Sequence, residues 1–193
     1  MIITEPKWKS WVVETKQPLF TPEQCQKIID AGRRQKPQQA QVGMNRPEGG
    51  VDTKKRTTTI SWIPFKEMQP MYKEINNFIQ KANKNHFGFG DIQITEQAQF
   101  TEYPEGGFYD WHMDTDVNMQ HEPPVRKISM TLLLSPENQF EGGDLELMSP
   151  GKKVNLKQGH AITFASFLNH RVAPVTRGVR QSLVMWFGGE PFK

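Results

Sequence analysis

Two stretches in the first half of the chain carry apolar residues at helical spacing. In residues 22–35 apolar side chains recur every three or four positions, and Thr21 followed by Pro22 is typical of a helix start. Pro37 ends this helix, because proline lacks the backbone N–H that a helix interior needs. Residues 65–85 repeat methionine, aromatic and aliphatic side chains at the same spacing, which predicts a second helix with one face in the core.

From residue 88 onward the pattern changes to short strand-like runs separated by Gly, Pro and Asn. An earlier β-branched run at residues 57–63 predicts one more strand. The later runs cover residues 92–103, 108–114, 127–134, 144–148, 152–155, 160–164, 170–175 and 180–187. About eight short strands after two helices predict an α+β fold, in which the helices pack on one sheet of a jelly-roll sandwich or barrel.

The length of 193 residues fits one domain. We expect residues 1–90 to form a supporting region and residues 91–189 to form the β-rich functional core. Two loops are candidate lids over a site: the Gly- and Pro-containing residues 42–55, and residues 115–126.

The charge of the chain argues against nucleic acid as a partner. Its 24 Lys and Arg against 21 Asp and Glu leave a net charge of only +3. We interpret the two short basic clusters, residues 54–56 and 152–153, as solvated surface. Cys25, the one cysteine, excludes an internal disulfide framework, and no apolar run reaches the roughly 18 residues of a membrane span. A cytoplasmic protein is the expectation, and the oligomeric state is not determined by the sequence.

One His-x-Asp pair has metal-ligand spacing. Side chains alternate along a strand, so His112 and Asp114 point to the same side of the run at 108–114. His170 is the downstream candidate for a third ligand. Two histidines and one carboxylate leave three coordination positions open, which suits non-haem Fe(II). The spacing by itself also fits a hydrogen-bonded pair without metal, and we interpret His86, His121 and His160 as structural.

Arg180, ten residues after His170, strengthens the case for a ligand cavity. A turn at residues 176–178 brings two strands together, and this places Arg180 inside the same cavity. A buried arginine is costly unless it is paired, and its planar fork matches a carboxylate. Ser182 and Trp186 share its face of the strand. Three inward residues of the run at 92–103 are also polar: Gln99, Thr101 and Tyr103. Such a cavity predicts a dianionic ligand.

Residues 97–188 resemble the 2-oxoglutarate/Fe(II)-dependent oxygenases of the prolyl 4-hydroxylase type. That family shows a Tyr, a Gly pair, a second Tyr, His-x-Asp, a Gly-Gly-acid-Leu turn, and a distal His with a basic residue ten positions later. In this chain the motifs are, in order, Tyr103, Gly106-Gly107, Tyr109, His112-x-Asp114, Gly142-Gly143-Asp144-Leu145, and His170 with Arg180. The resemblance implies a double-stranded β-helix with the site between its sheets.

The resemblance also implies a role for each matching residue. It assigns Fe(II) to His112, Asp114 and His170, and the distal carboxylate of 2-oxoglutarate to Arg180, with Tyr103 and Ser182 assisting. Tyr109 and Trp186 match residues near the substrate of the family, although strict alternation turns Tyr109 away from His112. We expect Trp62 and Trp111 to lie in the core.

The implied reaction uses 2-oxoglutarate and O₂ as co-substrates, with ascorbate as a stimulant and L-ascorbic acid binding among the family's properties. It hydroxylates a prolyl or other amino-acid residue of a peptide or protein, as procollagen-proline 4-dioxygenase does, and releases succinate and CO₂. Arginine at position 180, where animal and plant prolyl 4-hydroxylases usually have lysine, weakens the case for proline. The alternatives are an oxygenase of a small molecule or nucleobase, and a non-oxidative jelly-roll metal protein.

Overall fold

The computed structural model describes residues 10–39, 55–115, 124–148 and 153–192. Most of both predicted lids, and His121 with them, lies outside these residues. In chain order the elements are β1 (Val12–Glu14), α1 (Pro22–Arg33), β2 (Gln38–Gln39), β3 (Arg56–Thr57), β4 (Thr59–Ile63), α2 (Gln69–Ala82), the π-helical turn η1 (Asn83–Phe87), β5 (Gln93–Ile94), β6 (Ala98–Tyr103), β7 (Phe108–His112), β8 (Val125–Leu133), the 3-10 turn η2 (Glu137–Gln139), β9 (Phe140–Gly142), β10 (Leu145–Leu147), β11 (Lys153–Val154), β12 (Ala161–Ala165), β13 (His170–Val172), β14 (Val175–Gly178) and β15 (Arg180–Gly189).

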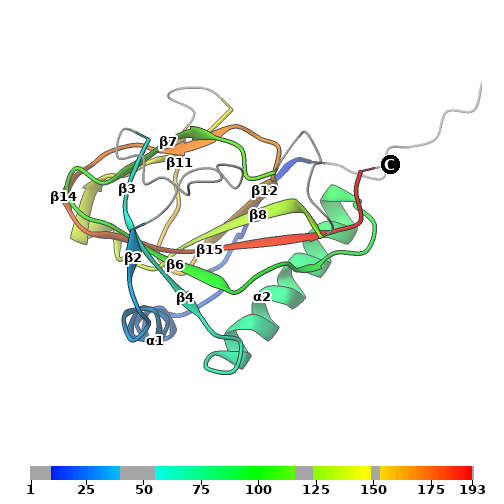
Figure 1. The fold of residues 1–193 in the computed structure, drawn as a ribbon, viewed down its shortest axis with the longest axis horizontal. Helices are drawn as coiled ribbons and strands as arrows, with labels where there is room; N and C mark the ends of the chain where they lie inside the picture. Colours follow the sequence, from blue (N-terminus) through cyan, green and yellow to red (C-terminus); the bar gives the residue numbers. More distant parts are fainter. Residues whose placement is uncertain (1–9, 40–54, 116–123, 149–152, 193) are drawn as a thin grey trace, which may run out of the picture.

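Two antiparallel sheets form the body of the protein. The larger has the strand order β1-β12-β8-β15-β6-β4-β2, with β5 also paired to β15, and the smaller has the order β11-β10-β13-β7-β3. Strands β14 and β9 pair antiparallel as a third, two-stranded sheet. In Figure 1 both helices lie on one side of the large sheet and the smaller sheet lies on the other. This is the predicted α+β sandwich with two helices on one sheet.

Helix α1 begins where the sequence predicts. The Thr21 hydroxyl accepts a hydrogen bond from the Gln24 amide, and the Gln24 side chain accepts one from the Thr21 amide. This reciprocal capping satisfies two amides that the first helical turn leaves free. Near the other end, Gly32 lies so close to the large sheet that a Cβ atom there would be 2.3 Å from the Phe100 ring. None of the helices in the described ranges is long and apolar enough to cross a membrane.

The large sheet separates two apolar clusters, and strand β15 shows how. Its residues Leu183, Met185 and Phe187 belong to the cluster under the helices, which also contains Ile28, Ile75 and Ile79. Alternate residues of the strand, including Val184 and Trp186, face the smaller sheet. A smaller cluster between the sheets includes Leu145, Phe164 and Val172. The space between the sheets is therefore only partly filled by apolar side chains, and the polar remainder is the site.

The element boundaries differ from prediction where the chain pairs irregularly. The predicted strand at 92–103 is two strands, β5 and β6, and the predicted strand at 170–175 divides into β13 and β14 on either side of Pro174, which has no amide to donate. Helix α2 begins at Gln69, four residues later than predicted. Strands β1, β2 and β9 were not predicted, since each has only two or three residues.

Candidate metal centre

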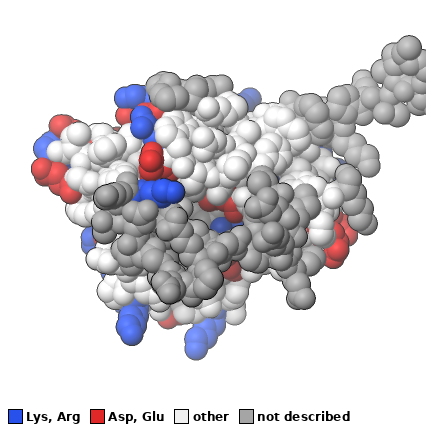
Figure 2. Space-filling model, turned by 45° about the horizontal axis from the view of Figure 1, so that its top comes forward, with Lys and Arg blue, Asp and Glu red and all other residues white. Residues whose placement is uncertain are grey.

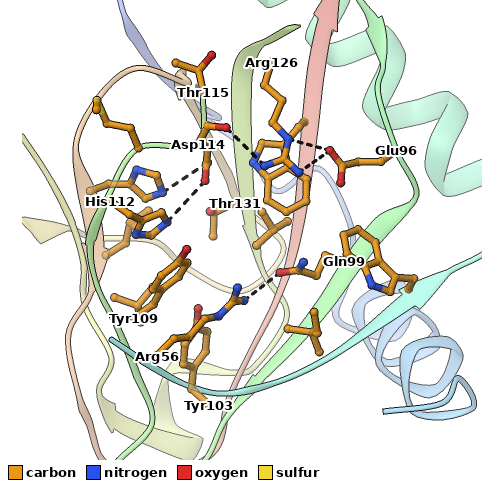
Figure 3. Close-up of a pocket in the computed structure, with 18 of the residues that line it drawn as sticks. Arg56, Glu96, Gln99, Tyr103, Tyr109, His112, Asp114, Thr115, Arg126 and Thr131 are labelled. Atoms are coloured by element: carbon orange, nitrogen blue, oxygen red, sulfur yellow. Dashed lines mark hydrogen bonds and ion pairs between the residues drawn. The ribbon is translucent and has the colours of Figure 1, made fainter. Parts of the chain in front are cut away.

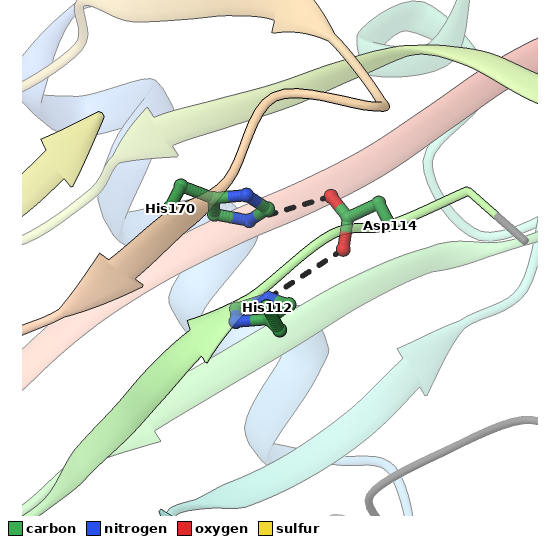
Figure 4. Close-up of side chains that lie close together, drawn as sticks. All are labelled: His112, Asp114 and His170. Atoms are coloured by element: carbon green, nitrogen blue, oxygen red, sulfur yellow. Dashed lines mark ion pairs between the residues drawn. The ribbon is translucent and has the colours of Figure 1, made fainter. Parts of the chain in front are cut away.

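The predicted ligand residues meet at the inner face of the smaller sheet. His112 ends β7, and His170 begins β13 directly opposite it. Asp114 follows β7 and reaches between them: its Oδ1 lies 3.6 Å from His112 Nε2 and its Oδ2 lies 3.5 Å from His170 Nε2 (Figure 4). One ligand atom from each residue lies within 4.8 Å of the other two, close enough for all three to share one metal ion.

Backbone carbonyls orient both imidazoles. His112 Nδ1 lies 2.7 Å from the carbonyl oxygen of Asp110, and His170 Nδ1 lies 3.0 Å from that of Leu168. Because a carbonyl can only accept, each Nδ1 carries the hydrogen and each Nε2 keeps a free lone pair. In both cases the carbonyl belongs to the residue two positions before the histidine, a relationship that residue types alone do not reveal.

The environment favours the protonation states that bind metal. Burial, together with the charge of nearby His170, lowers the pKa of His112 to about 3, so this imidazole is neutral at pH 7. Burial opposes ionisation of Asp114, but the two histidines and side-chain hydrogen bonding together outweigh it and lower the pKa of the carboxyl to about 2. A neutral imidazole and a carboxylate therefore face the same point, as a divalent metal ion requires.

The donor set fits a divalent first-row metal ion with open coordination positions. Two imidazole nitrogens and one carboxylate also occur as the ligands of catalytic Zn²⁺, so the ligands alone do not select iron. The choice depends on whether a second site for an anionic co-substrate lies nearby.

Arg180 supplies a buried positive charge in that region. It opens β15 opposite Tyr103, is only 3% exposed, and donates from Nη1 to the Ser182 hydroxyl at 3.1 Å. Burial lowers the pKa of Arg180, and no carboxylate of the described chain lies within ion-pair distance. The buried hydroxyl of Thr101, opposite Ser182, also has no hydrogen-bond partner within these residues. A buried cation without an ion pair and a buried hydroxyl without a hydrogen bond fit a site for an anionic ligand.

Glycine in the predicted Gly-Gly turn makes room for this arginine. Gly143 has a φ of +65°, and a Cβ atom there would lie 2.8 Å from Cδ of Arg180. Arg180 and Ser182 do not themselves line the cavity that opens at the three candidate ligands. Arg180 lies beside Tyr103, whose ring centroid is 5.6 Å from the guanidinium carbon and which does line that cavity.

A cavity of about 640 Å³ opens at the three candidate ligands, and Tyr103, Tyr109 and Trp186 line it together with them. The face drawn in Figure 2 is hollowed, and atoms of acidic and basic residues are visible inside the hollow. The volume is within the range of small-molecule and peptide side-chain sites.

Two arginines, each stacked on an aromatic ring, form opposite walls of the cavity (Figure 3). The Arg56 guanidinium lies 4.3 Å from the ring centroid of Tyr109 and donates to Gln99 at 3.0 Å. The Arg126 guanidinium lies 3.9 Å from the ring centroid of Trp186 and donates from Nε to Glu96 at 2.7 Å. The sequence did not point to either arginine. The interpretation of residues 54–56 as solvated surface was wrong for Arg56, which is 7% exposed.

The tryptophan predictions were also wrong. Trp62 lines the cavity, with its ring centroid 6.3 Å from that of Trp186. Trp111 belongs to neither apolar cluster and is covered by Arg171, whose guanidinium lies 5.2 Å from its ring centroid. Alternation could have found Trp62, because it shares a face of β4 with Ile60, which also lines the cavity.

Tyr109 does not point away from His112. The pairing of β13 with β7 shifts register between His170–His112 and Val172–Tyr109, so the regular alternation is interrupted. As a result the two rings of β7 stack, and Tyr109 lies in the cavity wall. Burial raises the pKa of its phenol to about 12, which keeps the hydroxyl protonated near neutral pH.

The sequence of this half of the chain matches a known family model. Residues 98–188 match the model of the 2OG-Fe(II) oxygenase superfamily, and the match contains all three candidate ligands and Arg180. This segment is therefore similar in sequence to 2OG-Fe(II) oxygenase domains. Among curated relatives, PKHD-type hydroxylases of Synechococcus sp. (strain CC9311) and Stenotrophomonas maltophilia (strain R551-3) are 33% and 32% identical over 119 and 127 residues. These matches cover 59% and 62% of this chain and 53% and 56% of the relatives, so the chain spans about half the length of the curated relatives it matches.

Solved prolyl hydroxylase structures share the fold. The viral collagen prolyl hydroxylase of Paramecium Bursaria Chlorella virus-1, in its 2OG complex, superposes with a TM-score of 0.72 at 18% identity, covering 94% of this chain and 97% of that one. The Pseudomonas putida prolyl-4-hydroxylase gives a TM-score of 0.69 at 22% identity, covering 92% of each chain. The sandwich described above is therefore the double-stranded β-helix that the sequence predicts.

Proposed function

We propose that this chain is an Fe(II)- and 2-oxoglutarate-dependent dioxygenase in which His112, Asp114 and His170 hold the metal. The observation that carries the proposal is the convergence of these ligand atoms, within 4.8 Å of one another, at a cavity close to a buried arginine that has no ion-pair partner among the described residues. We take the chain as one catalytic domain in which residues 1–90 support a core at residues 91–189.

The chain's own residues divide the work of binding. His112 and His170 present Nε2 to the metal because their Nδ1 atoms are engaged by carbonyl oxygens. Arg180 and Ser182 hold the distal carboxylate of 2-oxoglutarate, and the Tyr103 hydroxyl is placed to assist. When bound, Fe(II) supplies the activation of O₂ that hydroxylation of an unactivated C–H bond needs. The balanced reaction converts 2-oxoglutarate, O₂ and R–H into succinate, CO₂ and R–OH.

A prolyl or other amino-acid residue of a peptide or protein is the substrate that we favour. Tyr109 and Trp186 line the cavity, and their aromatic side chains make part of its wall apolar, which suits an aliphatic side chain. The relatives are named PKHD-type hydroxylases, and a prolyl hydroxylase of Trichoplax adhaerens with the same fold, at a TM-score of 0.67 and 18% identity, has been solved with a hypoxia inducible factor peptide fragment. We also propose a cytoplasmic location, which the buried free thiol of Cys25 supports.

Succinate production tests this function. The full chain, loaded with Fe(II) and supplied with 2-oxoglutarate and O₂, should form succinate and CO₂ slowly on its own and faster with a library of prolyl peptides. His170→Ala should abolish the succinate signal. His86→Ala is the matched control, because His86 lies on η1 and does not line the cavity. Tight metal binding with no succinate from the wild type would favour the non-oxidative metal protein instead.

A further inference from the structure

The three candidate ligands differ in what holds them. Both histidines are oriented by backbone carbonyls, which no substitution removes. The Asp114 carboxylate is oriented by a side chain: the Ser129 hydroxyl on β8 donates to Asp114 Oδ2 at 2.7 Å. Asp114 is therefore the one candidate ligand whose orientation depends on a replaceable hydroxyl.

A second buried hydroxyl supports the first. Ser166 Oγ lies 2.9 Å from Ser129 Oγ, and the two serines are 0% and 1% exposed. A serine hydroxyl has one hydrogen, and Ser129 uses it for the carboxylate, so Ser166 must be the donor to Ser129. The chain Ser166 to Ser129 to Asp114 thus has one direction, and each bond polarises the next.

The backbone of Ser166 holds the same aspartate from the other side. Its carbonyl accepts hydrogen bonds from the amides of Asp114 at 2.9 Å and Thr115 at 3.2 Å, and its own amide donates to the Lys127 carbonyl at 2.9 Å. Two residues later, the Leu168 carbonyl orients His170. One short turn between β12 and β13 therefore fixes two of the three candidate ligands.

We propose that Ser129 and Ser166 are positioning residues that hold the Asp114 carboxylate in its metal-binding orientation. This inference rests on the proposed function, since it requires the three ligands to bind a metal ion. Without Ser129 the carboxylate loses the hydroxyl donor that reaches it from β8 in the opposite sheet, and it is then freer to rotate about the Cβ–Cγ bond. Losing an outer hydrogen bond of this kind lowers metal affinity by about 10- to 100-fold.

Metal affinity, not turnover, is the readout. The metal-free full chain is titrated with Mn²⁺ alone, and free Mn²⁺ is measured by electron paramagnetic resonance. Ser129→Ala should raise the Kd by about 10- to 100-fold, and Ser129→Thr, which keeps the hydroxyl, should restore it to near the wild-type value. Ser166→Ala keeps the bond to Asp114 but removes its support, so its Kd should lie between those of the wild type and Ser129→Ala.

Ser61→Ala is the matched control, because the Ser61 hydroxyl is also buried and donates at 2.7 Å, but to the Gly32 carbonyl under helix α1. It should lower the Tm without changing the Kd for Mn²⁺. The proposal is overturned if Ser129→Ala binds Mn²⁺ like the wild type, or if Ser129→Thr binds as weakly as Ser129→Ala. If Ser129→Ala does not unfold cooperatively, Ser166→Ala and Ser129→Thr are compared with the wild type instead. A Kd for Mn²⁺ that is raised in Ser166→Ala but not in Ser129→Thr supports the proposal, and a wild-type Kd in Ser166→Ala overturns it.

The failure of the proposed function looks different. In that case the wild type itself binds Mn²⁺ no more tightly than His112→Ala does. Tight binding by the wild type, lost in His112→Ala but unaffected by Ser129→Ala, would leave the metal site in place and remove only the role of the serines.

Discussion

The phenol ring of Tyr109 is stacked on the imidazole of His112, with ring centroids 3.5 Å apart and planes inclined by 17°. The Arg56 guanidinium also lies on this phenol ring, 4.3 Å from its centroid. Tyr109 thus links the cavity wall to a candidate metal ligand, and it does so because a register shift between β13 and β7 brings both rings to one side.

This stack should contribute to metal binding. Tyr109→Phe keeps the ring and should leave the Kd for Mn²⁺ near the wild-type value. Tyr109→Leu removes the ring contact and should weaken binding by about 2- to 10-fold, since an aromatic pair contributes about 0.5–1.5 kcal/mol beyond burial. A calorimetric titration of both variants with Mn²⁺ checks this, and equal affinities for Leu and Phe would mean that the stack does not orient His112.

Arg180 should decide the affinity for 2-oxoglutarate. Arg180→Ala should raise the 2-oxoglutarate concentration at half saturation by about 10- to 100-fold, because a charged hydrogen-bonded contact contributes about 1.5–3 kcal/mol. Quenching of tryptophan fluorescence in the Mn²⁺-loaded protein measures this binding. Arg177→Ala, at an exposed arginine paired with Glu141, is the control. If Arg56→Ala loses the affinity while Arg180→Ala keeps it, the anion site lies at the cavity wall instead.

Gly32→Ala should destabilise the protein, against the trend for helices. Replacing glycine by alanine inside a helix usually stabilises it by about 1 kcal/mol. Here the new Cβ would lie 2.3 Å from the Phe100 ring, close to its attachment point, so we expect a loss of about 1–3 kcal/mol in the free energy of unfolding. Urea denaturation measures it. Gly90→Ala, with no atom within 4 Å of the new Cβ, should change stability by less than about 0.5 kcal/mol.

The thiol of Cys25 should be inert in the native protein. Burial raises its pKa from the ordinary 9.0 to about 11, so at pH 8 the thiolate fraction is about a hundredfold lower than in the unfolded chain. Reaction with a chromogenic disulfide should be correspondingly slow until urea is added. The unfolded chain releases this proton first, so the free energy of unfolding should fall as the pH rises from about 9 to 11, and Cys25→Ala should lack this component. A fast native reaction would contradict the burial.

The fold could be predicted from the sequence where local signals act alone. The capping of α1, for example, depends on Thr21, Pro22 and Gln24 in one turn. The short strands β1 and β2 could not be predicted, since they exist only because they pair with β12 and β4. A two- or three-residue strand has too few positions to show a period.

The site could be predicted where a residue type is itself informative. A His-x-Asp pair, a distal histidine and an inward arginine each suggest chemistry, and the structure brings the pair and the distal histidine together. The cavity walls could not be predicted in this way. Arg56 and Arg126 look like surface cations in the sequence, and only long-range contacts with Tyr109, Gln99, Glu96 and Trp186 bury them. The stacking of Tyr109 on His112 could not be predicted from the sequence either. It depends on a register shift, and the register is a property of the pairing of two strands.

The visible absorption of the Fe(II)-loaded protein, recorded on addition of 2-oxoglutarate without oxygen, tests the proposed site as a whole. We predict a weak charge-transfer band in the wild type that is absent in His112→Ala and in His170→Ala, because the co-substrate must chelate an iron held by these ligands. A wild-type protein that binds iron but shows no band at saturating 2-oxoglutarate would contradict this prediction.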